Sequence, residues 1–382
     1  MSIYLDNAAT TPMDPAVVEA MLPILNQTFG NPSSIHSFGR EAKAAVEKSR
    51  KKVADLLGTS PAHLIFTSGG TEADNMALRS SVETLGIRHA ITSPLEHHAV
   101  LHTLEHLAHS GLIELTILEC DREGNLNFDQ LWQLMDKNPN SLVSLMHGNN
   151  EIGNLNPVEE LAIEIRNRGG IFHCDTVQTV GHFPHKLSDW QTHFMVGSAH
   201  KFHGPKGIGF LYTSPGTKIL PFIQGGAQER NMRGGTENVI GIVGLAKALE
   251  LACTEMESHK NHISRLKTRM IQKLKIEIPE VSFNGRSGFV EDSLYTVLNV
   301  SLPPSEINEM LIFNLDVNKV AASGGSACSS GSEVGSHVLR AIKADPERGA
   351  VRFSFSRYNT ESDIDTAVQA LSAMFKPKKE AV

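Results

Sequence analysis

From residue 63 onwards, short apolar runs alternate with longer segments whose apolar residues recur at helical spacing. The short runs are typical of buried strands and the longer segments of amphipathic helices. This alternation predicts an α/β domain with a mainly parallel sheet that is covered by helices on both faces. The expected strands are 63–67, 90–92, 113–118, 142–146, 171–175, 194–196 and 208–212, and the expected helices between them are 71–85, 98–109, 128–135 and 157–168.

The pattern differs at the two ends of the chain. A turn-rich arm at 6–12 leads into two helical patterns, 14–28 and 37–57. After Asn238 a long amphipathic segment extends to about Ile276 and is interpreted as an interdomain helix. The remainder predicts a smaller α+β domain, with strands 294–302 and 351–355 and helices 305–314 and 362–375. We expect an arm (1–13) that packs with the small domain, a large cofactor-binding domain (14–250) and a small C-terminal domain (251–382).

Composition excludes several classes of function. The chain has 382 residues, and 40% hydrophobic with 20% charged residues is ordinary for a soluble globular protein. A net charge of -7 gives no support to nucleic-acid binding. No stretch approaches the roughly 20 apolar residues that a membrane span needs, and the first residues do not resemble a secretion signal. Four widely separated cysteines fit free thiols in a reducing compartment, so we expect a cytoplasmic protein.

Lys201 stands out because it follows a predicted strand and precedes a Gly/Pro turn and a second apolar run. This order puts the lysine on a tight turn at the mouth of the sheet. A partly desolvated ammonium there has a lowered pKa, and its amine can attack an aldehyde. The alternative interpretation is a solvated lysine in a surface hairpin.

Two further strand ends carry groups that suit the same chemistry. Gly69-Gly70-Thr71 lies where a strand turns into a helix, and free N–H groups at a helix start favour a phosphate. Asp175 ends a buried strand, where a carboxylate needs a cationic partner such as a protonated pyridine nitrogen. Each feature also has a purely structural interpretation. Together with Lys201 they match the requirements of a pyridoxal 5'-phosphate site.

Three more residues are candidates for this site. His97 begins a helix after another strand, where an imidazole could stack on a flat ring and exchange protons. Arg352 lies on a small-domain strand and is either paired internally or binds a carboxylate. Cys328 lies in a loop rich in glycine and serine, where an accessible thiol can react, whereas Cys174 and Cys253 lie in apolar segments.

These residues and their surroundings resemble cysteine desulfurases of the NifS/IscS type, within the class V aminotransferase-like enzymes of pyridoxal-phosphate fold type I. The resemblance covers nearly the whole chain. The motifs that carry it are Leu5-Asp6-Asn7-Ala8-Ala9-Thr10-Thr11, Gly30-Asn31-Pro32-Ser33-Ser34, Asn149-Asn150-Glu151-Ile152-Gly153, Ser198-Ala199-His200-Lys201, Arg233-Gly234-Gly235-Thr236-Glu237-Asn238 and Tyr358-Asn359-Thr360.

The resemblance implies a role for each candidate residue. Lys201 would bond the cofactor and move the substrate proton, Asp175 would pair with the pyridine nitrogen, and His97 would stack on the ring. Arg352 would bind the carboxylate of L-cysteine, and the Cys328 thiolate would attack the substrate sulfur, giving a persulfide and L-alanine. The remaining implied contacts are Gln178 and Asn150 to the ring hydroxyl, Gly70, Thr71, Ser198 and His200 to the phosphate, and Thr236 to the phosphate of the neighbouring subunit in a homodimer.

Some positions depart from the family pattern. Gly70 stands where many relatives carry alanine, and Ala227 replaces the third glycine of a usual run. The chain ends shortly after Phe375 and lacks the longer tail with which housekeeping members engage the iron–sulfur scaffold. The protein that accepts the sulfur, an iron–sulfur scaffold or another sulfur carrier, therefore stays open.

Other functions remain as alternatives. His102-Thr103-Leu104-Glu105-His106 fits a His-x-x-Glu-His zinc-peptidase pattern, although it leaves Lys201 and Asp175 unexplained. A selenocysteine lyase or another class V enzyme shares the fold. A protein that binds pyridoxal phosphate and activates other proteins without catalysis is a further alternative.

Overall fold

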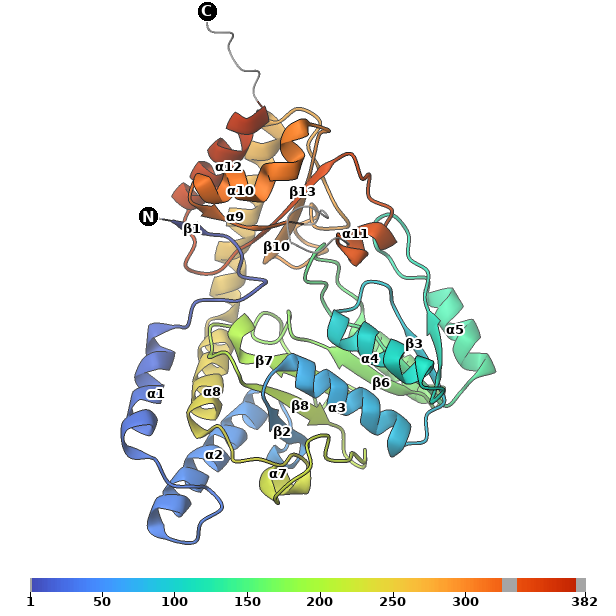
Figure 1. Ribbon diagram of the computed structural model, residues 1–382, viewed down its shortest axis with the longest axis vertical. Coiled ribbons are helices and arrows are strands. Elements are labelled where there is room, and N and C mark those ends of the chain that lie inside the picture. The colour runs from blue at the N-terminus through green and yellow to red at the C-terminus, as the bar shows by residue number, and fades with distance from the viewer. Residues whose placement is uncertain (1, 325–334, 376–382) are drawn as a thin grey trace, which may run out of the picture.

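A seven-stranded sheet organises the larger part of the chain in the computed structural model, which describes residues 2–324 and 335–375 (Figure 1). The strand order is β2-β8-β7-β6-β5-β3-β4, and within this sheet β8 alone runs against its neighbours. The predicted mainly parallel sheet is therefore confirmed. Its strands are β2 (Leu64–Thr67), β3 (His89–Thr92), β4 (Glu114–Ile117), β5 (Ser141–Ser144), β6 (Ile171–Asp175), β7 (Phe194–Ser198) and β8 (Gly209–Thr213).

Helices cover both faces of this sheet. Successive side chains of a strand point to opposite faces, so strands that are apolar throughout need a cover on each face. Ile65 and Val196 pack against α3 on one face, whereas Phe66 and Met195 belong to the core on the other face. Helices α3 (Gly70–Glu83) and α4 (His98–His109) cover the first face. The second face is covered by α2 (Ser37–Leu56), α5 (Phe128–Lys137), α6 (Val158–Asn167) and α8 (Val239–Thr254), with α1 (Pro15–Gln27) packed outside α8.

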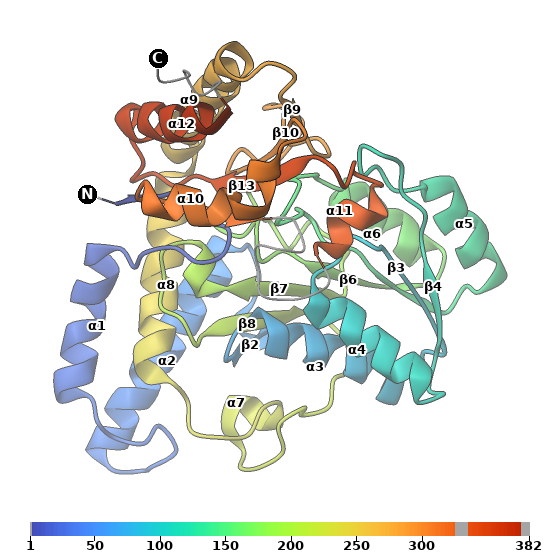
Figure 2. The same ribbon diagram turned by 45° about the horizontal axis from the view of Figure 1, so that its top comes forward.

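The C-terminal part builds a second, smaller sheet above the large one (Figure 2). Its strand order is β12-β13-β10-β9, all pairs antiparallel, and α9 and α12 pack together beside it. The N-terminal arm joins this part of the molecule because β1 (Ile3–Tyr4) pairs in parallel with β11 (Val320–Ala321). The remaining elements are β9 (Ser282–Phe283), β10 (Val297–Leu302), β12 (Ser323–Gly324), β13 (Gly349–Ser354), α9 (Met256–Glu277), α10 (Leu311–Val317), α11 (His337–Ala341), α12 (Glu361–Phe375) and the short α7 (Gln228–Asn231).

The expectation of a single interdomain helix over 238–276 is wrong, because the structure has two helices that meet at Glu255 (Figure 1). Asn238 caps α8 by accepting a hydrogen bond from the Gly241 N–H. Most residues of α8 are buried because α1, α2 and the large sheet all pack on it. Such a helix is not amphipathic, so helical spacing could not separate it from α9. The proposed division of the chain after residue 250 stays a prediction.

The small domain departs from the expected boundaries in two places. The expected strand 294–302 begins only at Val297, and the expected helix 305–314 is a 3-10 turn, Glu306–Met310, followed by α10. Ser305 caps that turn by accepting a hydrogen bond from the Ile307 N–H. No helix in the described part of the chain is long and apolar enough to span a bilayer.

Candidate active site

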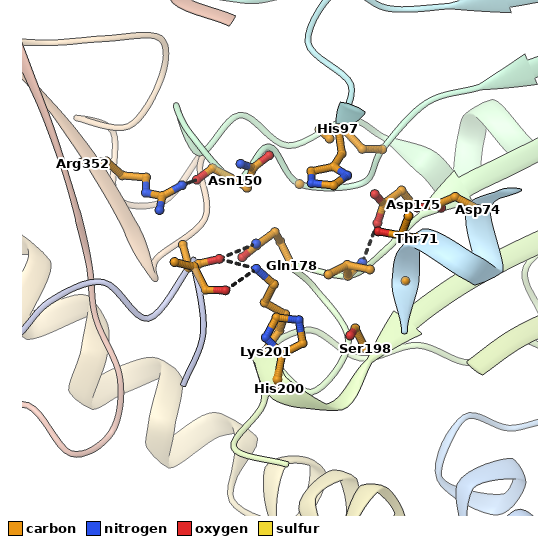
Figure 3. Close-up of a pocket in the computed structure, with 16 residues that line it drawn as sticks. Thr71, Asp74, His97, Asn150, Asp175, Gln178, Ser198, His200, Lys201 and Arg352 are labelled. Atoms are coloured by element: carbon orange, nitrogen blue, oxygen red, sulfur yellow. Dashed lines mark hydrogen bonds between the residues drawn. The ribbon is translucent and has the colours of Figure 1, made fainter. Parts of the chain in front are cut away.

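A cavity of about 400 Å³ opens at the carboxyl ends of β6 and β7, where ligands bind in open α/β sheets (Figure 3). The N-termini of α3 and α4, the N-terminal arm and β13 also contribute to its wall. The structure therefore brings together residues that are up to 344 positions apart, from Ala8 to Arg352. Ten of the candidate residues line the cavity: Gly70, Thr71, His97, Asn150, Asp175, Gln178, Ser198, His200, Lys201 and Arg352.

Lys201 ends a 3-10 turn, Ala199–Lys201, that connects the antiparallel strands β7 and β8. Its Nζ donates hydrogen bonds to the backbone oxygens of Ala8 (2.5 Å) and Ala9 (2.9 Å) in the N-terminal arm (Figure 3). Burial and the positive charge of Arg352 lower the pKa of Lys201 to about 8. The interpretation of a solvated hairpin lysine is therefore wrong, because the side chain is enclosed by the arm.

Asp175 ends β6 and is only 6% exposed. Its Oδ1 accepts a hydrogen bond from the Val177 N–H at 2.8 Å, and no cation forms an ion pair with it among the described residues. Burial raises the pKa of Asp175, which the nearby charges of His97 and Lys201 partly offset. The Asp175 carboxyl group thus lines the cavity without a cationic partner among the described residues.

The start of α3 provides free backbone donors beside Ser198 and His200. Gly69 is the N-cap of α3, and no side chain caps the helix. A helix N-terminus without a cap leaves N–H groups that favour an anion. A Cβ on Gly70 would lie 2.7 Å from Val177 Cγ2, so the bare glycine keeps this wall of the cavity compact.

The opposite wall carries His97, Asn150 and Gln178 (Figure 3). His97 is the N-cap of α4, and its Nδ1 accepts the Ala99 N–H at 3.2 Å. Desolvation lowers the pKa of His97, so the neutral ring is favoured near neutral pH. Gln178 donates from Nε2 to the Ala8 oxygen at 3.1 Å, which ties the N-terminal arm to this wall.

Arg352 projects from β13 towards the cavity and is paired internally, so the internal pairing is confirmed and the binding of a carboxylate stays a prediction. Its Nη1 donates to the Asn150 oxygen at 3.0 Å, and its Nη2 lies 3.0 Å from Asp6 Oδ1 and 3.1 Å from Ser323 Oγ. The buried Nε has no hydrogen-bond partner in the described residues. Nη1 carries two N–H groups and makes one of these contacts, so Arg352 keeps donor capacity for an incoming carboxylate.

Of the two other candidate residues, one lies away from this cavity and one is not described by the structure. Thr236 is exposed and lines a separate cavity of about 140 Å³ with Arg233 and Ser68. Cys328 lies outside the described residues. The thiols of Cys174 and Cys253 have pKa values raised by burial, for Cys253 to about 11, in keeping with inert thiols.

The zinc-peptidase pattern gains no support from the described part of the chain. His102, Glu105 and His106 lie on α4, and no group of three potential ligand side chains converges there or elsewhere in residues 2–324 and 335–375. The His102 ring instead stacks on His98, with ring centroids 4.6 Å apart.

Sequence reasoning missed Asp74 and Glu96, two buried acids near Asp175, and the backbone oxygens of the arm. Asp74 lies one helical turn after Gly70, so the i, i+4 spacing could have indicated that both face the cavity. Glu96 directly precedes His97 and could have been noticed as an acid in a strand-to-helix connection. The backbone contacts from Ala8 and Ala9 leave no sequence signal.

Comparisons with known proteins agree with this geometry. Residues 3–367 match the family Aminotransferase class-V. The chain is 43% identical over 379 residues to the cysteine desulfurase IscS of Dictyoglomus turgidum, a match that covers 98% of this chain and 94% of that protein.

Solved structures show the same fold. A NifS-like protein superposes with a TM-score of 0.90 at 36% identity, covering 98% of this chain and 99% of the other. The structure described as SspA in complex with cysteine has a TM-score of 0.80 at 31% identity, covering 94% of this chain and 100% of the other. The chain therefore belongs to the class-V aminotransferase family and, within it, to the cysteine desulfurases of the IscS and NifS type.

Proposed function

We propose that this enzyme removes sulfur from L-cysteine with the help of pyridoxal 5'-phosphate, releasing L-alanine and leaving a persulfide on Cys328. The observation that carries the proposal is the cavity that joins the Lys201 amine, the unpaired Asp175 and the open start of α3. The family is pyridoxal-phosphate-dependent, and the cysteine complex of SspA supports the choice of substrate.

The residues present fit this cofactor at three points. Asp175 supplies a buried carboxylate without a cationic partner in the described chain, which suits a protonated ring nitrogen. Gly70, Thr71, Ser198 and His200 surround the uncapped start of α3, which suits a phosphate. Lys201 supplies an amine whose pKa is about 8, so a substantial fraction is uncharged and nucleophilic at neutral to mildly alkaline pH.

The chain's own groups would then divide the work. When bound, pyridoxal phosphate supplies an electron sink for negative charge at the substrate Cα. Arg352 binds the substrate carboxylate through a guanidinium N–H that its contacts with Asn150, Asp6 and Ser323 leave free. The Lys201 amine takes up the Cα proton and later returns a proton to the carbon skeleton. His97 at the start of α4 would hold the cofactor ring, and Asn150 and Gln178 would hold its hydroxyl group.

Cys328 would carry out the sulfur transfer. Its thiolate attacks the sulfur of L-cysteine, an S–S bond forms, and the C–S bond breaks. The electron pair of that bond stays on the carbon fragment, which gains a proton and leaves as L-alanine. L-cysteine and the enzyme thiol are thereby converted into L-alanine and an enzyme persulfide, with no external oxidant or reductant.

A homodimer would complete the site. Thr236 lies outside the cavity of its own chain, so it can serve as a phosphate ligand only in the site of a second subunit. Large apolar side chains also remain exposed around the connection between α1 and α2 and could be covered by that subunit: Leu25 (61% exposed), Phe29 (77%) and Ile35 (91%).

The persulfide would pass to a protein acceptor, an iron–sulfur scaffold or another sulfur carrier. A cytoplasmic location fits this role and the cysteine usage of the chain. The rival activity is that of a selenocysteine lyase. Selenocysteine has the same carboxylate and amine as L-cysteine, so it would fit the same site.

The test is to load purified protein with pyridoxal phosphate, add L-cysteine and a thiol reductant, and measure L-alanine and sulfide. We expect equal amounts of both products, no sulfide from Cys328→Ala, and unchanged activity from the control Cys253→Ala. Sulfide release by Cys328→Ala at the wild-type rate would contradict the persulfide role. A kcat/KM for selenocysteine far above that for cysteine would favour the lyase.

A further inference from the structure

Three carboxyl groups are buried together at the inner end of the cavity. Asp175 is 6% exposed, Asp74 is 1% exposed and Glu96 is fully buried. They come from β6, α3 and the connection before α4, and Figure 3 shows Asp74 beside Asp175. The proposed function uses Asp175 alone, so the other two have no assigned role.

The groups that contact Asp74 and Glu96 differ. Glu96 Oε1 accepts hydrogen bonds from the Met146 N–H after β5 at 2.8 Å and from Ser93 Oγ at 3.1 Å, whereas its buried Oε2 has no hydrogen-bond partner in the described residues. Asp74 Oδ1 has no such hydrogen bond: it lies 3.3 Å from His173 Nε2 without a hydrogen bond between them, and both atoms are buried without a hydrogen-bond partner in the described residues. A buried carboxyl oxygen without a hydrogen-bond partner requires an explanation.

His173 lies between Asp74 and a hydroxyl group deeper in the protein. Its Nδ1 lies 2.8 Å from Ser144 Oγ on the neighbouring strand β5. Burial lowers the pKa of His173 to about 3, so the ring is neutral and cannot balance a negative charge on Asp74. Ser144, His173 and Asp74 thus form one row of polar groups that leads to the cavity wall beside Asp175.

The charges around Asp74 and Asp175 favour only one ionised carboxylate at this site. Asp175 and His173 of β6 and Glu96 face Asp74, whereas His97 and Lys201 face Asp175 from the cavity side. Burial, the charge of Asp175 and the charge of Glu96 raise the pKa of Asp74 well above its usual value. A pyridine nitrogen adds a single positive charge, which one ionised carboxylate already balances.

We propose that Asp74 is a positioning residue that stays a neutral carboxylic acid, beside His173, and keeps Asp175 as the one ionised carboxylate that faces the ring nitrogen of the cofactor. This inference rests on the proposed function. Asp74 acts only through Asp175. A neutral acid beside Asp175 adds no charge, whereas a second carboxylate would place two negative charges in a buried site.

The test compares Asp74→Asn, Asp74→Ala and the control Glu96→Gln as pyridoxal-phosphate-loaded protein. Asparagine copies a neutral carboxylic acid in size and hydrogen bonding, whereas alanine removes it. The readouts are the cofactor dissociation constant at neutral pH and the absorbance of the bound cofactor from neutral to alkaline pH. Circular dichroism of each variant shows whether it is folded.

We expect Asp74→Asn to bind the cofactor within about threefold of wild type and Asp74→Ala to bind about tenfold more weakly. Wild type should show an alkaline change in the cofactor absorbance as Asp74 loses its proton. Asp74→Asn should lack this change, and Glu96→Gln should keep it but at a lower pH, because the charge of Glu96 raises the pKa of Asp74. If Asp74→Ala does not fold, the comparison of Asp74→Asn with wild type still decides.

The proposal is overturned if Asp74→Asn keeps the alkaline change, or if a folded Asp74→Ala binds the cofactor as wild type does. Failure of the proposed function gives a different result: wild type itself then binds no cofactor and releases no alanine, and the role of Asp74 falls with it.

Discussion

The reactivity of Lys201 comes from its surroundings rather than from its position in the chain. Its ammonium is held by two backbone oxygens of the arm, which stabilise it without adding a full negative charge. Removal from water and the nearby Arg352 then lower its pKa to about 8. A lysine in this state can act both as a nucleophile and as a base near neutral pH.

Replacing Lys201 by alanine should lower the rate of alanine release by about 10³-fold, since a positioned acid–base group contributes on the order of 10² to 10⁴. The exposed Lys206 on the same connection offers a matched control, and Lys206→Ala should remain within about twofold of wild type. Steady-state alanine production measures both variants. Equal losses from the two variants would contradict a special role for Lys201.

The pH dependence of cofactor capture follows from the same pKa. Only the uncharged amine attacks an aldehyde, so the rate at which cofactor-free protein binds pyridoxal phosphate should rise with pH and level off above about 8. Since the charge of Arg352 lowers the pKa of Lys201, Arg352→Gln should move this midpoint to higher pH. Stopped-flow absorbance measures the rate, and an unchanged midpoint would contradict the coupling.

At the scale of elements, one buried ion pair fixes the segment that leads to Thr236. Arg50 of α2 donates two hydrogen bonds to Glu229, at 2.7 and 2.8 Å, and both side chains are 3% exposed. Glu229 also accepts the Phe66 N–H of β2 at 2.9 Å, and its backbone has a φ of 43°. The pair therefore holds an unusual backbone conformation between α2 and the large sheet.

Arg50→Met should lower the free energy of unfolding by about 3–5 kcal/mol, because Glu229 would be left buried and unpaired. The exposed pair of Lys186 and Asp189 provides the control, and Lys186→Ala should cost less than about 1 kcal/mol. Urea unfolding followed by circular dichroism compares the two. A similar effect of both substitutions would show that burial of the pair is unimportant.

At the scale of the whole molecule, the site depends on parts that lie far apart in the chain. The arm contributes the acceptors for Lys201, the large sheet contributes Asp175, and β13 of the smaller sheet contributes Arg352. The arm is fixed in place because β1 pairs with β11 and Asp6 pairs with Arg352. Separating the smaller sheet from the large one would therefore alter the surroundings of both Lys201 and Arg352.

The proposed homodimer predicts complementation between defective subunits. Mixing Lys201→Ala subunits with Thr236→Ala subunits should produce mixed dimers in which one site has both residues intact. Alanine production should then exceed the average of the two separate variants by several-fold. Two different affinity tags, used in sequence, isolate the mixed dimers, and activity no higher than that average would show that Thr236 does not act across subunits.

The sequence by itself determined the alternating strands and helices, because periodic burial leaves a periodic pattern. It also indicated Lys201 and Asp175 as candidates, because ligands bind at the carboxyl ends of the strands in such sheets, and both residues line the cavity. It did not separate α8 from α9, since a helix that is packed on most sides has no polar face. Only the tertiary structure decided that backbone oxygens of Ala8 and Ala9 hold Lys201, and that Asp74 joins Asp175. Such contacts depend on how distant segments pack, and a backbone oxygen is present at every residue, so no local pattern marks them.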